Sequence, residues 1–283
     1  MRFVKMHGIG NDYIYIDCFE QSAPQDIPAL AVEMSRPHFG VGSDGLVLIL
    51  PSETADCRMR MFNKDGSEGI MCGNAVRCVG KYMHDTGRIS GDELSVETLG
   101  GIKHLKLTAE NGICTAARVD MGVPSFVPEE IPVAAPENRV EIETPDGTKL
   151  RFTCVSVGNP HAVTFDLWPE DEWFYKYGPW LEQHPLFPDR INVEFARVND
   201  RGHIDMRVWE RGSGETLACG TGACASLVAA VLTGRADRQV TMDLLGGSLE
   251  LDWSFDDGHV YQEGPATFVF DGEWLGEESS THF

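Results

Sequence analysis

Two cysteines stand at matching places in two copies of one short pattern. Cys72 lies in MRMFNKDGSEGIMCG and Cys219 lies in MRVWERGSGETLACG, in the second half of the chain. The spacing between the cysteines aligns further identical residues in the two halves, namely Met59 with Met206, Arg60 with Arg207 and Glu68 with Glu215. The sequence therefore predicts a duplicated domain with one reactive thiol in each half.

The surroundings of the two thiols favour proton transfer at a carbon atom. A thiol acts as a base only when ionised, and the N-terminus of a helix lowers a cysteine pKa from about 8.5 to between roughly 3.5 and 7.5. Cys72 and Cys219 both precede a predicted helix, and Gly73-Asn74 and Gly220-Thr221 follow them, so that backbone N–H groups can bind a carboxylate there. One thiolate can then remove an α-proton while the opposite thiol protonates the other face. This chemistry inverts a stereocentre.

No cofactor is expected for this chemistry. Other enzymes overcome the weak acidity of an α-carbon with an electron sink such as pyridoxal phosphate, for which the sequence has no pattern. The N–H groups and helix dipoles would instead stabilise the developing negative charge once the domains close and exclude water. We expect the proline-rich stretch from Val123 to Pro136 to be the interdomain linker and hinge.

The elements that position the cysteines are repeated in the two halves. Helices are expected over 74–86 and 221–233, because each begins at an N-cap residue and stops at a glycine. The second helix is apolar nearly all round, so strands should surround it. Apolar and alternating runs predict strands at 3–6, 13–17, 45–50, 57–62, 94–98, 103–108, 139–144, 150–157, 162–166, 191–198, 203–209, 240–244, 248–253 and 266–270.

The repeat also predicts the domain organisation. Residues 1–118 form the expected N-terminal half and residues 119–263 the C-terminal half. The strand at 266–270 has no counterpart at the end of the first half. We therefore expect residues 264–283 to return and complete the N-terminal half.

Length, charge and apolar segments limit the function classes. The 283 residues are enough for two domains. The net charge of −21 opposes nucleic-acid binding. The N-terminus has no apolar signal region, and the most apolar predicted helix is about half the length that a bilayer requires. We expect a cytoplasmic protein that binds a small-molecule substrate and neither nucleic acid nor membrane; the sequence leaves a homodimer open.

The remaining cysteines have a simpler interpretation. Eight cysteines are scattered through a chain without a secretory signal, so a disulfide framework is not expected. No C-x-x-C or H-x-x-x-H spacing is present, and we expect no metal site. The cysteines outside the repeated pattern should pack as small apolar side chains: Cys18, Cys57, Cys78, Cys114, Cys154 and Cys224.

Over essentially its whole length the sequence resembles the diaminopimelate epimerases. The matching segments are KMHGIGNDY (5–13), GVGSDG (40–45), FNKDGSEGIMCGNAVRC (62–78), VDMGVP (119–124), VGNPHAV (157–163), FPDRINVEF (187–195), ERGSGETLACGTGACA (210–225) and GPATFVFDGE (264–273). The resemblance implies an α+β fold of two pseudo-symmetric domains, each an antiparallel β-barrel wrapped around a central helix. It also implies cofactor-independent interconversion of LL- and meso-diaminopimelate, a precursor of lysine and peptidoglycan.

The resemblance further implies a set of site residues. It gives Cys72 and Cys219 as acid and base, with His161 and Glu210 as their helpers. Gly73-Asn74 and Gly220-Thr221 would take the substrate carboxylate. The implied substrate contacts are Asn11, Asn63, Asn159, Asn192, Glu210 and Arg211. The chain departs from the family pattern at Ala75, where many members have glycine, and at Gly45, where some have glutamine.

Three alternatives stay open on the sequence. A proline racemase or hydroxyproline epimerase shares the two-cysteine logic but closes a small pocket around one ring, whereas Arg211 can grip a distant carboxylate with its planar fork. A non-catalytic redox or metal protein would join Cys72 to Cys219 in a switch disulfide, which the two helix ends and the missing metal spacing oppose. An isomerase of the phenazine-biosynthesis type shares the domain plan but lacks the cysteine pair.

Overall fold

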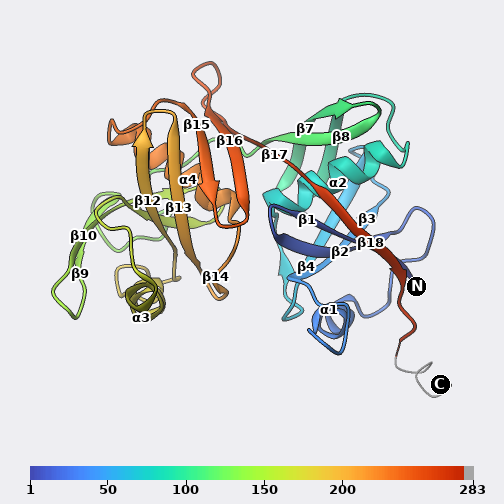
Figure 1. Cartoon of the computed structure of the whole chain (residues 1–283), viewed down its shortest axis with the longest axis horizontal. Coiled ribbons are helices and arrows are strands. Elements are labelled where there is room, and N and C mark those ends of the chain that lie inside the picture. Colours follow the sequence, from blue (N-terminus) through green and yellow to red (C-terminus); the bar gives the residue numbers. More distant parts are fainter. Residues whose placement is uncertain (277–283) are drawn as a thin grey trace. The chain divides into compact units, whose positions relative to one another are not determined.

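A computed structural model describes residues 1–276 and divides the chain into two compact units. Unit 1 consists of Met1–Val119 and the segment from Pro265 onward, and unit 2 consists of Asp120–Gly264 (Figure 1). Both units are rich in strands, and the described part of the chain contains four helices. None of these helices is long and apolar enough to cross a membrane.

Unit 1 is a curved sheet whose strands follow one another in the order β18-β1-β2-β3-β4-β6-β7-β8. The short strand β5 (Glu68–Gly69) adds to β4. The strands of the main order are β1 (Arg2–Gly8), β2 (Asn11–Asp17), β3 (Gly45–Leu50), β4 (Cys57–Asn63), β6 (Glu93–Thr98), β7 (Gly101–Glu110), β8 (Ile113–Asp120) and β18 (Thr267–Glu273).

Unit 2 repeats this arrangement in the order β9-β10-β11-β12-β13-β15-β16-β17. The short strand β14 (Gly214–Glu215) adds to β13, as β5 adds to β4. The strands of the main order are β9 (Arg139–Glu143), β10 (Lys149–Ser156), β11 (Pro160–Thr164), β12 (Asn192–Asp200), β13 (His203–Glu210), β15 (Gln239–Leu244), β16 (Gly247–Trp253) and β17 (Val260–Gly264).

The predicted α+β fold of two strand-rich units is confirmed, but the sheets are mixed where antiparallel barrels were expected. In unit 1, β2 pairs parallel with β3 and β4 with β6; in unit 2, β11 pairs parallel with β12 and β13 with β15. A parallel pair needs a crossover connection, usually a helix. Each of the four helices occupies one such crossover: α1 (Ile27–Ser35), α2 (Gly73–Asp85), α3 (Asp171–Glu182) and α4 (Gly220–Leu232).

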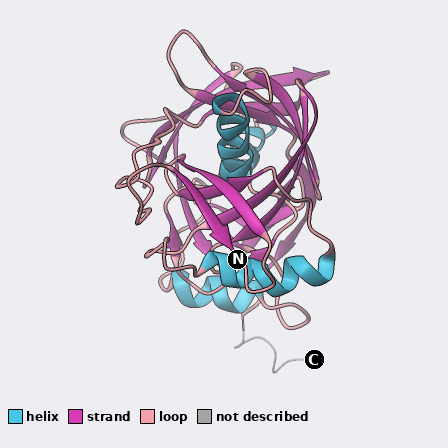
Figure 2. Ribbon diagram, turned by 90° about the vertical axis from the view of Figure 1, so that its left-hand side faces the viewer, coloured by secondary structure: helices cyan, strands magenta, loops and turns pink. Residues whose placement is uncertain are grey.

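Helices α2 and α4 are the central helices, and both predicted positions are confirmed to within one residue. Every residue of α2 from Gly73 to Met83 is buried, and α4 is buried along most of its length. Figure 2 shows a helix enclosed by a ring of strands. Gly87 and Gly234 follow the two helices with φ of 71° and 72°, the left-handed conformation that glycine adopts at a helix end. Each central helix is therefore buried along most of its length and is followed by a glycine.

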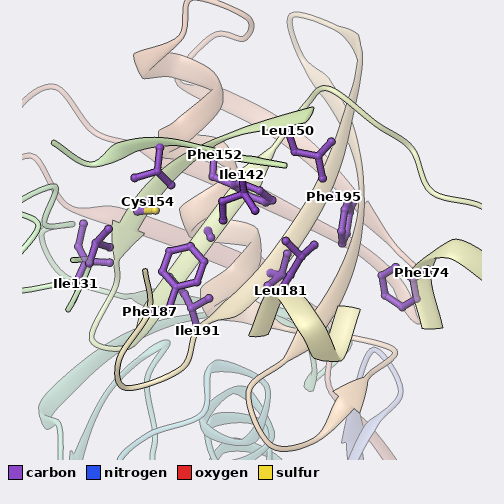
Figure 3. Packing of buried hydrophobic residues seen from close by; sticks show 14 residues of the cluster. Ile131, Ile142, Leu150, Phe152, Cys154, Phe174, Leu181, Phe187, Ile191 and Phe195 are labelled. Atoms are coloured by element: carbon purple, nitrogen blue, oxygen red, sulfur yellow. The ribbon is translucent and has the colours of Figure 1, made fainter. Parts of the chain in front are cut away.

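The stretch from Val123 to Pro136 is not a linker, contrary to the sequence prediction. It belongs to unit 2, where Ile131 and Val133 are 1% and 7% exposed. Both pack in a core cluster that includes Phe152 and Phe187 (Figure 3). Prolines are typical of a connecting segment, but the apolar residues between them here are buried in the core of unit 2.

One strand of each unit, β9 or β18, follows the last repeated strand of the other half in the chain. Strand β9 follows β8 in the chain yet pairs with β10 in unit 2. In the same way, β18 follows β17 and pairs antiparallel with β1 in unit 1, with Arg2 opposite Glu273. The strand expected at 266–270 thus forms most of β18. Each unit is completed by a strand that continues from the last strand of the other half.

Candidate active site

Cys72 and Cys219 occupy the N-cap positions of α2 and α4, which confirms that both cysteines precede a helix. The backbone is extended at both, with φ and ψ of −136° and 122° at Cys72 and −118° and 102° at Cys219. The first N–H groups of a helix have no partner within the helix, and they carry the positive end of its dipole. Each thiol therefore lies beside donors that can bind an anion.

In unit 1 the Cys72 thiol lies in a network of amides. Its Sγ donates to Asn11 Oδ1 at 3.4 Å, and Asn74 Nδ2 donates to the same oxygen at 3.3 Å. Asn11 Nδ2 in turn donates to Asp44 Oδ2 at 2.8 Å. The carboxylate of Asp44 also accepts the N–H of Asp12, at 3.2 Å, so it acts as an acceptor and fixes the orientation of the Asn11 amide. Asn11 consequently presents its oxygen to Cys72.

The other predicted residues of unit 1 lie near the ends of elements. Gly73 is the first residue of α2, and Asn74 is 2% exposed. Asn74 Oδ1 accepts a hydrogen bond from Arg77 Nη2 at 2.8 Å, which holds the amide in place. Asn63 ends β4, and its Nδ2 donates to Ser67 Oγ at 3.0 Å.

In unit 2 the structure joins His161 to two oxygen atoms. His161 Nδ1 lies 2.6 Å from Glu194 Oε1, and Nε2 lies 2.9 Å from Asn159 Oδ1. The His161 and Glu194 side chains are both 0% exposed. Burial raises the pKa of Glu194, while the facing His161 opposes that rise. This is a desolvated acid–base pair in a site of low dielectric constant.

Asn192 and Arg211 are connected through the backbone. Asn192 lies opposite His161 in the parallel pairing of β11 with β12. Its Nδ2 donates to Pro160 O at 2.8 Å, and its Oδ1 accepts the Arg211 N–H at 2.9 Å. The Arg211 side chain is exposed, and its Nη1 donates to Asp189 O at 3.1 Å. The guanidinium therefore keeps most of its donors available for a ligand.

The Cys219 thiol is 5% exposed and lies at the start of α4. Its Sγ accepts the Gly222 N–H at 3.4 Å and lies 3.6 Å from Thr221 Oγ1. Burial raises the pKa of Cys219 well above its ordinary value, and the charges of Glu210 and Glu194 raise it further. The expectation that the helix start lowers the pKa was therefore wrong for Cys219, because burial and two carboxylates outweigh the helix.

Glu210 and Gly220 complete this group. Glu210 accepts a hydrogen bond from Thr216 Oγ1. Burial raises the pKa of the Glu210 carboxyl, and hydrogen bonds from Thr216 and Cys219 lower it in part. A side chain at Gly220 would place its Cβ 2.7 Å from Gln262 Oε1, so only glycine fits at this position without a shift of its neighbour.

Sequence reasoning missed Asp44 and Glu194, although both lie in segments that resemble the family. The signal for Glu194 was available, because Asn192 and Glu194 share a face of a predicted strand and interrupt an otherwise apolar run. Such a strand residue is charged at a position where burial is expected. Among residues 1–276, no group of three or more His, Cys, Asp or Glu side chains is arranged to hold a metal ion.

Comparison with known proteins identifies the family. The family model for diaminopimelate epimerase matches residues 3–127 and 153–269. A diaminopimelate epimerase of Acetivibrio thermocellus is 55% identical over 279 residues, covering 96% of this chain and 98% of that protein. One from Methanococcus maripaludis is 52% identical over 278 residues, covering 96% and 99%, respectively.

Solved structures show that the fold is shared more widely. A probable proline racemase from Agrobacterium radiobacter superposes with a TM-score of 0.72 at 16% identity, covering 99% of this chain and 94% of that chain. A phenazine biosynthesis protein of the PhzF family from Bacillus anthracis gives 0.67 at 16%, covering 98% and 99%, respectively. These likenesses concern the fold alone, whereas the family model and the curated relatives extend over nearly the whole sequence. The chain belongs to the diaminopimelate epimerase family.

Proposed function

We propose that this chain interconverts LL- and meso-diaminopimelate without a cofactor, with Cys72 and Cys219 as the two acid–base groups. The observation that carries the mechanism is the repeated placement of a cysteine at the N-cap of a central helix. Membership of the family supports the substrate. As proposed, the reaction requires the two thiols to reach one α-carbon from opposite faces.

The proton transfers are balanced between the two sulfur atoms. The thiolate of one cysteine takes the α-proton, and the thiol of the other gives its proton to the opposite face of the carbanion. In unit 2 the Glu210 carboxylate is a suitable acceptor for the Cys219 proton, because burial raises its pKa toward that of the weak acid it must deprotonate. His161 is proposed as the second helper in the same unit.

The substrate carboxylate at the reacting carbon would be bound by N–H groups at the helix starts. Gly73-Asn74 and Gly220-Thr221 supply these groups, and the carboxylate oxygens carry the charge that develops as the α-proton leaves. Asn11, Asn63, Asn159 and Asn192 are proposed to orient the rest of the molecule. Glu210 is also proposed to contact the substrate.

Arg211 is proposed to recognise the far end of diaminopimelate. Its side chain is exposed, and in the described part of the chain one hydrogen bond, from Nη1 to Asp189 O, ties the guanidinium to the protein. A planar fork of donors suits a second carboxylate, which proline and hydroxyproline do not have. This feature favours diaminopimelate over the substrates of a proline racemase.

The test is α-deuterium wash-in followed by NMR. Purified protein without added cofactor is incubated in D₂O with LL-diaminopimelate, with meso-diaminopimelate and, separately, with proline and hydroxyproline. We expect deuterium at the α-carbon and formation of the second isomer from either diaminopimelate. Exchange into the cyclic amino acids with none into diaminopimelate would support the racemase alternative instead.

We also propose that the enzyme works in the cytoplasm, because the mechanism needs both thiols reduced and that compartment keeps them so. The proposed partner is the small-molecule substrate, with neither nucleic acid nor membrane, and a homodimer is the proposed assembly. Activity measured in cell fractions checks the location. Light scattering on the purified protein checks the assembly, and a monomer that is fully active would remove the dimer from the proposal.

A further inference from the structure

Glu194 is a buried carboxylate that the mechanism above does not use. Its side chain is 0% exposed. One oxygen, Oε1, lies 2.6 Å from His161 Nδ1, whereas Oε2 is buried and has no hydrogen-bond partner among residues 1–276. A buried, incompletely paired carboxylate is unfavourable for stability and therefore calls for an explanation.

The position of Gly222 shows that the same carboxylate also lies close to the Cys219 thiol. A Cβ added at Gly222 would be 2.7 Å from Glu194 Oε1 and 3.2 Å from Cys219 Sγ. The carboxylate and the thiol thus flank one glycine in the first turn of α4. The absence of a side chain at that glycine is what lets the two groups approach each other.

A purely structural role explains these contacts poorly. Strands β11 and β12 are already neighbours in a parallel ladder, with Val163 opposite Glu194, so they need no side-chain link. Buried ion pairs are weak sources of stability, because desolvation opposes their attraction. An apolar residue at 194 would fill the core with less penalty.

We propose that Glu194 is a positioning residue for the epimerase reaction: it fixes the ring and the proton of His161 and supplies negative charge beside Cys219. The inference rests on the proposed function. Glu194 Oε1 faces Nδ1 of the His161 ring and the Asn159 amide oxygen faces Nε2, so both ring nitrogens are held by oxygen atoms. Glu194 thereby orients the ring inside a dry site, much as a buried carboxylate orients a catalytic histidine.

The titratable groups around Glu194 come from several elements and define what a test must separate. His161 on β11 faces it directly, Cys154 on β10 feels its charge, and Glu210 on β13 and Cys219 at the start of α4 lie within its electrostatic reach. Removal of the charge should lower the pKa of Cys219, because the charge of Glu194 raises it. A change of packing alone would not move that pKa in a defined direction.

The decisive variant is Glu194→Gln, which keeps the shape and removes the charge. We expect kcat to fall roughly tenfold or more, but by less than the roughly 10⁴-fold that is the most an acid–base group typically contributes. KM should stay within about twofold, because a fully buried side chain does not touch substrate. The pH–rate limb that belongs to the Cys219 thiol should move to lower pH, because the charge of Glu194 raises the pKa of that thiol. Glu194→Asp, which keeps the charge, should retain more activity than Glu194→Gln.

Two readouts do not depend on turnover. NMR of the His161 ring should show a changed Nδ1 signal in Glu194→Gln, because an amide then replaces the carboxylate that faces Nδ1, and the pH midpoint for alkylation of Cys219 should fall. Val193→Ala is the matched control, because Val193 is the buried neighbour on the same strand and makes the core smaller without removing a charge. The Val193→Ala variant should be less stable than the wild-type protein, while the His161 ring signal and the Cys219 alkylation midpoint stay unchanged.

Several results would overturn the inference. Wild-type kcat in Glu194→Gln, or an unchanged His161 ring signal, would make Glu194 a structural residue. Equal losses in Glu194→Gln and Val193→Ala with unchanged pH profiles would do the same. Failure of the wild-type protein to epimerise diaminopimelate would instead refute the proposed function, and the NMR and alkylation readouts would still decide the role of Glu194.

Discussion

The two units hold their cysteines in the same frame but surround them with different chemistry. Strand register makes the comparison residue by residue: Tyr13 lies opposite Gly45 in unit 1, where His161 lies opposite Asn192 in unit 2. Two positions further along the second strand, Val47 corresponds to Glu194. The buried acid–base pair of unit 2 therefore has a tyrosine and a valine in its place in unit 1.

The next strand shows the same change. Leu46 lies opposite Phe62 and Val193 opposite Trp209, so the residues that follow on β4 and β13, Asn63 and Glu210, also correspond. Unit 1 thus has an amide where unit 2 has a carboxylate. Both units keep a cysteine at the start of the central helix, while the residues on the neighbouring strands give each thiol different surroundings.

Removal of each thiol gives the strongest test of whether the two cysteines are equally necessary. Cys72→Ala and Cys219→Ala should each lower epimerisation roughly 100- to 10,000-fold, because each removes one of the two proposed proton carriers. Circular dichroism and the melting temperature should show a folded protein. Cys57→Ala, which deletes a buried thiol on β4, is the control and should keep its activity. More than about a tenth of wild-type turnover in either of the first two variants would end the two-base mechanism.

A second difference between the two units lies at Arg211, whose counterpart in unit 1 is Lys64. Arg211→Lys should lower kcat/KM for diaminopimelate roughly tenfold or more, since a charge-assisted hydrogen bond contributes about 1.5–3 kcal/mol and lysine has no planar fork. Arg190→Lys is the control, because Arg190 pairs with Glu182 at 3.5 Å nearby. Steady-state assays on diaminopimelate and a shorter amino acid measure the effect. Equal losses on both substrates would argue against recognition of the distal end.

Thiol alkylation should show the contrast between the two cysteines directly. Cys72 is half-buried, whereas Cys219 is 5% exposed and burial beside Glu210 and Glu194 raises its pKa. At neutral pH Cys72 should react with iodoacetamide roughly tenfold faster or more, because thiolate reacts and the thiol does not. The Cys219 rate should rise as the pH is increased toward its raised pKa. Peptide mapping with time gives both rates, and equal rates would show that the environments do not differ.

We expect the smallest effect from substitutions at two equivalent positions, Gly222→Ala in α4 and Ala75→Gly in α2. Gly222→Ala should displace Glu194 or Cys219 and destabilise the protein by about 1–3 kcal/mol. If about 1.4 kcal/mol of that strain falls on the transition state, kcat drops about tenfold. Ala75→Gly should reduce stability by about 0.5–1 kcal/mol through chain entropy and leave kcat unchanged. Denaturant melts and kcat test both, and a harmless Gly222→Ala would mean that the carboxylate is free to move.

The sequence was sufficient for the repeated elements and for the thiols. Helices α2 and α4 have clear caps and glycine stops, and most strands have apolar or alternating patterns. Helices α1 and α3 were missed: α1 has only nine residues, and α3 contains Pro179 and is rich in aromatic residues. Gly178 in α3 is required because its Cβ would lie 2.6 Å from Trp209, so packing and not propensity explains that helix.

The site was harder to predict where its partners are far apart in the chain. Asn11 meets Cys72 because α2 packs against β2, and His161 meets Glu194 because a crossover brings β11 and β12 together in parallel. Neither contact can be derived from sequence patterns, which do not specify strand register. The pKa of Cys219 shows the same limit. The helix start is visible in the sequence, but burial and the two nearby carboxylates, which decide the sign of the shift, are properties of the folded barrel.

The exchange of β9 and β18 affects how the chain can fold during synthesis. Most strands of unit 1 precede those of unit 2 in the chain, yet β1 stays unpaired on one side until β18 emerges. Met1 and Trp274 then exchange backbone hydrogen bonds of 2.9 and 2.7 Å. Unit 2 receives β9 before β10 is made. We therefore expect unit 1 to complete its fold after unit 2, although most of unit 1 is synthesised earlier. In stalled nascent chains that end before β18, a protease should cut unit 1 more readily than unit 2. Until then the open edge of β1 is a site for wrong pairing that the completed protein no longer exposes.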